Sequence, residues 1–216
     1  MTTILCFKAK KGKQLIVVGD TQHIFEGSTV EESKIKLFNK LLFCGSGYDR
    51  IIGDIYLEIC KLRAFSNCSK KILELKKIKI EDYQRVQTYG LSSEQVEDCD
   101  FFIIDTKKVR GDKIFLREKN QINNIDMIGS SASRIGEVQK KLRGVYDFPY
   151  SPLTQQKIIE IYDWIGRHDP YTGHPAVFKL EVFVLEKNKT AKKFSINFKH
   201  NIQRFDNYEV RNEITR

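Results

Sequence analysis

The sequence predicts an α+β fold in which two antiparallel sheets pack face to face between outer layers of helices. Strand-like segments come in groups that alternate with groups of helix-like segments. Turns of hairpin length join the strand segments near the N-terminus, and such turns suit antiparallel rather than parallel strands. Each helix-like segment carries one apolar stripe and therefore needs a sheet face to cover. Two packed sheets with helices outside both satisfy these three observations.

The first half of the chain is expected to open with a hairpin and to continue into long helices. Helical spacing of apolar residues begins at Asp49, recurs in a lysine-rich stretch at 70–80 and is expected again at 83–96. β-Branched and aromatic residues mark the strands. The strands expected in this half cover 3–7, 15–18, 34–38 and 41–44.

The second half is expected to alternate in the same way. Pro152 is a helix start signal, and the stretch that follows carries apolar residues at helical spacing. The helices expected in this half cover 133–142 and 154–165, and the strands cover 101–105, 114–117, 125–128, 177–185 and the alternating residues 194, 196 and 198.

Composition narrows the class of protein. With 216 residues, 41% of them hydrophobic, the chain suits one domain over 1–216, and 187–216 forms a basic extension whose packing stays open. No apolar run approaches the roughly 18 residues that span a bilayer. The net charge of +9 comes from dispersed lysines without interleaved aromatic residues, so nucleic acid is not an expected partner. Five cysteines without CxxC spacing and four histidines without metal-ligand spacing predict a reduced, cytoplasmic protein with no metal or cofactor.

Thr2 is the most informative single residue. Once Met1 is removed, its hydroxyl and a free α-amine lie on the same residue, so a nucleophile and a base come together. The amine has an ordinary pKa of about 7.7–8.0 and can accept a proton near neutral pH. Asp20 ends the second expected strand, where a carboxylate can pair with a cation or serve as a turn residue.

Several segments, in chain order, resemble motifs of the proteasome β-subunit family and of its bacterial ATP-dependent protease relatives. The resemblance implies the four-layer αββα fold of the N-terminal nucleophile hydrolases. It also implies peptides or unfolded proteins as substrates, assembly into a homo-oligomer and an ATPase as a partner still to be tested. The segments are Thr2-Thr3-Ile4-Leu5, Gly19-Asp20-Thr21-Gln22, Lys34-Ile35, Gly45-Ser46-Gly47-Tyr48-Asp49, Gly129-Ser130-Ser131-Ala132 and His168-Asp169-Pro170-Tyr171-Thr172-Gly173.

The resemblance assigns roles to individual residues. Thr2 matches the nucleophile, and Asp20 matches the carboxylate that pairs with a lysine near the terminal amine. Lys34 is the first choice for that lysine, because it starts the strand that leads to the glycine turn. Lys36, on the same face of the strand at period two, is the second choice, since the segment up to Gly45 is shorter than in the family and leaves the register open. Gly45, or Gly47 if the turn is shifted, matches the backbone N–H that stabilises the oxyanion. The remaining matches, which form a polar cluster around the amine, are Ser130, Asp169 and Thr172, the last in place of a serine.

The function implied is that of a threonine peptidase working through an acyl-enzyme. A transpeptidase would form the same ester and pass it to an amine instead of water. A third interpretation is a non-catalytic structural subunit of a proteasome-like assembly. The resemblance allows it, because the family also has structural subunits that share the fold but lack the catalytic residues.

The mature chain is expected to begin at Thr2, because the mechanism requires a free α-amine on that residue. Intact mass spectrometry of the soluble, folded protein reads the N-terminus directly. A mass that still includes Met1 would contradict a self-activated Thr2.

Overall fold

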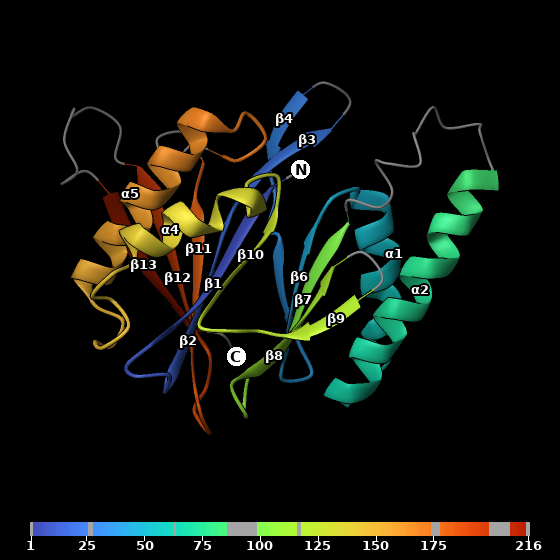
Figure 1. The fold of residues 1–216 in the computed structure, drawn as a ribbon, viewed down its shortest axis with the longest axis horizontal. Coiled ribbons are helices and arrows are strands. Elements are labelled where there is room, and N and C mark those ends of the chain that lie inside the picture. Colours follow the sequence, from blue (N-terminus) through green and yellow to red (C-terminus); the bar gives the residue numbers. More distant parts are fainter. Residues whose placement is uncertain are drawn as a thin grey trace.

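Two antiparallel sheets pack face to face, and helices cover both outer faces (Figure 1). The computed structural model describes residues 2–25, 28–62, 64–85, 99–115, 118–173, 178–198 and 208–214. This arrangement of two sheets between helix layers confirms the predicted fold class.

The first sheet has six strands in the order β10-β1-β2-β11-β12-β13. All of its pairings are antiparallel. The N-terminal strand lies inside this sheet, so the start of the chain is held from both sides. The strands are β1 (Thr3–Ala9), β2 (Gln14–Asp20), β10 (Ile125–Gly129), β11 (Leu180–Glu186), β12 (Lys192–Phe198) and β13 (Tyr208–Ile214).

The second sheet has five strands in sequential order, β5-β6-β7-β8-β9. A separate hairpin, β3 (Gln22–Phe25) with β4 (Ser28–Glu31), leads from the first sheet into the second. The strands of the second sheet are β5 (Ile35–Phe38), β6 (Leu41–Ser46), β7 (Asp100–Asp105), β8 (Arg110–Phe115) and β9 (Glu118–Gln121).

Each sheet has its own helix layer. Helices α1 (Asp49–Ile59) and α2 (Phe65–Arg85) pack on the second sheet. The short η2 (Ala132–Arg134), α4 (Ile135–Lys141) and α5 (Pro152–His168) pack on the first. Helix α5 begins where its sequence indicates, because Pro152 occupies its first turn and the Ser151 hydroxyl accepts a hydrogen bond from the Thr154 N–H.

Strand alternation divides the apolar side chains between the layers. In β1, Ile4 and Cys6 face the second sheet, whereas Leu5 and Phe7 face α4 and α5. In β5, Ile35 belongs to the core between the sheets. The same rule decides which polar side chains at the strand ends can enter the gap between the sheets.

Most of the expected elements are confirmed, and the structure adds others. The unexpected strands are β9, the β3–β4 hairpin and β13. Because β12 and β13 extend the first sheet, part of the basic extension 187–216 belongs to the sandwich. The helix expected at 83–96 falls almost entirely outside the described residues. Among the described residues, no helix is long and apolar enough to cross a membrane.

Candidate active site

Thr2 directly precedes β1, and its side chain is fixed at the end of the first sheet. Its hydroxyl donates a hydrogen bond to Oδ2 of Asp20, the last residue of β2. The backbone N–H of Thr3 donates to the same oxygen over 3.3 Å. Antiparallel pairing brings the two residues together, because Ile4 lies opposite Gly19 and the chain ends beyond them meet. Only 2% of Thr2 and 1% of Asp20 are exposed, so bulk water is excluded from the contact.

The Asp20 carboxylate is unusual in its electrostatic setting. Burial raises its pKa to about 6, although hydrogen bonds from Thr2 and from backbone N–H groups act in the opposite direction. One of these is the N–H of Gln22, which lies 2.9 Å from Oδ1. Among the described residues, no cationic side chain forms an ion pair with Asp20. In the described part of the chain, the carboxylate is therefore held by neutral donors.

The carbonyl of Thr2 is held from the opposite sheet. The Ser46 hydroxyl, at the end of β6, donates to this carbonyl over 2.7 Å. On the other side, Gly129 leaves no room for a side chain, since a Cβ atom there would lie 1.7 Å from the Thr2 oxygen. Gly129 also has φ +98°, a conformation that favours glycine. Both residues belong to the glycine-containing segments 45–49 and 129–132 that resemble family motifs, but the resemblance assigns neither of them this function.

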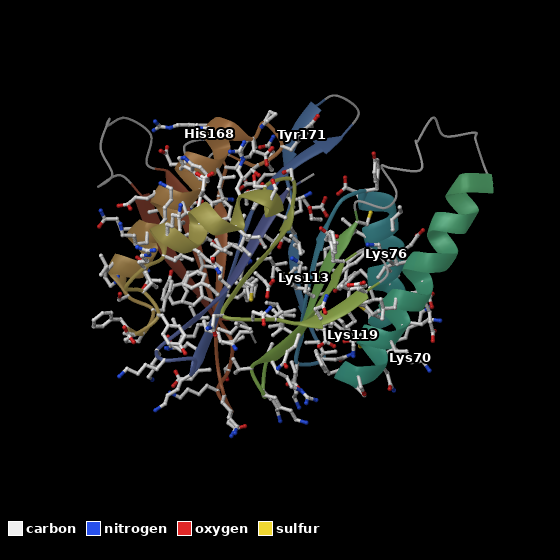
Figure 2. All side chains as sticks on the ribbon, viewed as in Figure 1. Lys70, Lys76, Lys113, Lys119, His168 and Tyr171 are labelled. Carbon is white, nitrogen blue, oxygen red and sulfur yellow. The ribbon has the colours of Figure 1, made fainter. Side chains whose placement is uncertain are left out.

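A polar cluster around Asp169 supports Thr3, the neighbour of the nucleophile. The Thr3 hydroxyl lies 2.6 Å from that of Thr172, which donates to Asp169 over 2.9 Å. Ser130 and Ser131 also donate their hydroxyl protons to Asp169. The structure therefore brings Ser130, Asp169 and Thr172 together, with their contact to Thr3, and Ser131 joins them. His168 and Tyr171 lie on either side of Asp169 in the sequence, and Figure 2 shows both at the end of the molecule where Figure 1 marks the N-terminus.

The Asp169 carboxylate differs from Asp20 in its ionisation. Partial burial acts to raise its pKa, but hydrogen bonds from Ser130, Ser131, the Tyr171 N–H and Thr172 outweigh burial and lower it below the ordinary value. Asp169 is therefore a stable anion that fixes the orientation of the surrounding hydroxyls. Its neighbour Asp20, with a raised pKa, is the carboxylate suited to exchange a proton near neutral pH.

Both candidate lysines lie on the helix side of β5. Lys34 forms an ion pair with Asp49 at the start of α1, with 3.6 Å between Nζ and Oδ1. Lys36 pairs with Glu32 over 3.8 Å, and its ammonium lies 4.9 Å from the centre of the Tyr56 ring of α1. The cause is alternation: Ile35 fills the space beside Gly19, so both of its neighbours point away from the gap. The ion pair expected between Lys34 and Asp20 is not formed between these described residues.

The other candidates have simpler explanations. Gly45 faces α1, where a Cβ atom would lie 2.6 Å from Ile52, so helix packing requires a glycine there. Gly47 follows Ser46 in the turn to α1 and is half-buried. The side chains of His23, His174 and His200 lie outside the described residues. Among the residues that the structure describes, no three His, Cys, Asp or Glu side chains gather as a metal site.

Comparison with solved structures identifies the fold. The chain is similar to Anbu (ancestral beta-subunit) from Yersinia bercovieri, with a TM-score of 0.62 and 11% identity over 89% of this chain and 86% of that one. Anbu from Hyphomicrobium sp. strain MC1 gives a TM-score of 0.61 and 11% identity over 89% and 87% of the two chains. For Thiobacillus denitrificans BPH the TM-score is 0.58 at 12% identity, over 88% and 100%.

These comparisons define a fold class and no more. The fold is proteasome-like, and identities of 11–12% show the fold alone. No protein-family model and no curated protein matches the sequence.

Substituting Gly129 by alanine is expected to displace Thr2. The added Cβ would meet the Thr2 carbonyl at 1.7 Å and would require a positive φ, so the free energy of unfolding should fall by about 2 kcal/mol or more. Gly136→Ala in α4 is the matched control. Nothing lies within 4 Å of its Cβ position, so it should be neutral or stabilising by up to about 1 kcal/mol. Denaturant unfolding of both variants measures the difference, and equal stabilities would contradict the observed packing around Thr2.

Proposed function

We propose that the protein is a threonine peptidase in which Thr2, exposed as the N-terminus after removal of Met1, attacks peptide bonds. The observation that carries the proposal is the hydrogen bond from the Thr2 hydroxyl to the buried carboxylate of Asp20. An ordinary strand start has no need of a buried carboxylate at this position. A nucleophile does need a proton acceptor within hydrogen-bond reach.

The reaction follows the usual course of acyl transfer. The Thr2 oxygen attacks the carbonyl carbon of the substrate, the amine of the cleaved bond leaves, and water hydrolyses the resulting ester. Ser46 and Asp169 hold the residue that attacks, the first through the Thr2 carbonyl and the second through Thr172 and Thr3. We assign stabilisation of the oxyanion to a backbone N–H near the end of β6, either that of Gly45 in the strand or that of Gly47 in the turn that follows.

The expected substrate is a peptide or an unfolded protein segment. An extended chain can approach a strand end and align its backbone with the sheet, whereas a folded surface cannot reach a residue as buried as Thr2. The proposal includes a homo-oligomeric state, supported by a structural neighbour that is named as a beta-subunit. Native mass spectrometry reports this state.

One observation supports a second candidate function, that of a non-catalytic structural subunit. Lys34 pairs with Asp49, so the lysine that the family resemblance requires beside Asp20 is absent from the described contacts. The retained contact between Thr2 and Asp20 and the assembled Asp169 cluster favour the catalytic function over the structural one.

Turnover is expected to depend on the Thr2 hydroxyl. With a diverse peptide library and product analysis by mass spectrometry, Thr2→Ala should lower cleavage by about 1,000-fold or more, because it removes the nucleophile. Thr2→Ser is the matched control, since it keeps the hydroxyl and should retain measurable cleavage.

Three other results of the same experiment would be decisive. Equal activity of the alanine and serine variants would exclude Thr2 as the nucleophile. Spliced peptides as the main product would identify a transpeptidase. Unchanged peptides with every variant would favour the structural subunit.

A further inference from the structure

The buried carboxylate of Asp20 has a hydroxyl partner where a cation would be expected. A charged group that is 1% exposed is costly to bury unless a countercharge or several donors compensate it. In the described part of the chain, Asp20 receives only neutral donors, and one of them is the hydroxyl of Thr2. A carboxylate in this state binds a proton more readily than an ordinary aspartate.

The register of β5 keeps Lys34 and Lys36 away from Asp20. Ile35 lies in the gap between the sheets, and its Cδ1 atom would be 3.2 Å from a Cβ atom added to Gly19. Lys34 therefore emerges on the other side and reaches Asp49. Moving Lys34 into the gap would require a one-residue slip of β5, which would bring Ile35 out of the core.

The remaining proton acceptor is the α-amine that removal of Met1 exposes on Thr2. A lysine nearby would lower the pKa of this amine, whereas a carboxylate nearby favours its charged, protonated form. Asp20 already contacts the hydroxyl of the same residue. Among the described residues no lysine pairs with Asp20, so the carboxylate favours the protonated form of the amine, which makes the amine a poorer base.

We propose that Asp20 itself accepts the proton of the Thr2 hydroxyl during the attack, a catalytic function rather than an orienting one. The inference rests on the proposed function of Thr2 as nucleophile. It also removes the need for Lys34 in the reaction.

The proposed step balances in atoms and charge. As the bond between the Thr2 oxygen and the substrate carbonyl carbon forms, the hydroxyl proton moves to Oδ2 of Asp20. The carbonyl π electrons move to the substrate oxygen. When the tetrahedral intermediate collapses, the carbon–nitrogen bond breaks and Asp20 returns the proton to the leaving amine. Water then repeats the sequence on the ester, with Asp20 again taking the proton.

Other titratable groups around Asp20 have separate partners. The Tyr162 phenol of α5 donates to the carbonyls of Val18 and Thr3, and burial, followed by the charge of Asp20, raises its pKa well above the ordinary value. Tyr162 therefore stays neutral throughout the range in which Asp20 titrates. On β11, Glu181 lies opposite Gly19 and is bound by Lys193 over 2.8 Å.

Asp169 is the second carboxylate near this end of the sheet. It is stabilised as an anion by its own hydroxyl donors and connects to the site through Thr172 and Thr3. Asp20 is thus the group in this set whose protonation changes near pH 6.

The experiment measures how fast an alkyl fluorophosphonate labels Thr2 of the processed protein as a function of pH, with the site read by tandem mass spectrometry. Labelling should fall as the pH drops through a midpoint of about 6 or below, because protonated Asp20 cannot accept the hydroxyl proton. Lys34→Met should show the same midpoint. Asp20→Asn should slow labelling by about 100-fold or more and abolish the pH dependence in this range. Circular dichroism confirms that the variants fold.

The alternatives give different results. A midpoint at about 7.7–8.0, the range of an ordinary α-amine, would assign the proton to the amine and overturn the inference. Loss of the pH dependence in Lys34→Met would overturn it as well. Labelling with the expected pH dependence but without cleavage of any peptide would refute the peptidase and leave the proton acceptor confirmed. Absence of both labelling and cleavage would refute both.

Discussion

The antiparallel pairing of β1 with β2 is the constraint on which the rest of the site depends. It brings the start of the chain beside the end of β2, so that the hydroxyl of Thr2 meets the carboxylate of Asp20. Neither residue has this environment in isolation, since Asp20 is unusual only because the surrounding sandwich buries it. Burial raises the energy of the charged carboxylate, and the same burial makes it a better proton acceptor.

The two sheets contribute differently to the site. The first supplies Asp20 at the end of β2, Gly129 at the end of β10 and Thr2, which directly precedes the strand β1 between them. The second contributes Ser46, whose hydroxyl crosses the gap to the Thr2 carbonyl. The segment after α5 adds Asp169, which is anchored in turn by hydroxyl donors. The second sheet thus adds a contact to the Thr2 carbonyl that the first sheet does not supply.

The layered fold could be predicted from the sequence, because apolar periodicity and hairpin-length turns depend on local patterns. Strand β9 could not, since its four residues are all polar and exposed and show no alternation. The residues of the Asp169 cluster could be predicted only through the resemblance of 129–132 and 168–173 to family motifs, because their contacts join segments far apart in the chain. The expected contact between Lys34 and Asp20 was wrong, because Lys34 pairs with Asp49 instead. A shift of one residue along a strand moves a side chain to the other face of the sheet, and the sequence did not define the position of β5 that closely. The function of Ser46 was hidden because it depends on a contact across 44 positions of the chain.

Carbon-13 NMR of the Asp20 carboxyl group, assigned with the Asp20→Asn variant, measures the pH at which this carboxylate binds a proton. In the chain that retains Met1, we expect a midpoint of about 6, because burial favours the protonated form of the carboxyl group. In Thr2→Ala the midpoint should move higher, because the hydroxyl that stabilises the charged carboxylate is lost. A midpoint near the ordinary aspartate value of about 3.9, unaffected by the loss of the Thr2 hydroxyl, would contradict the account.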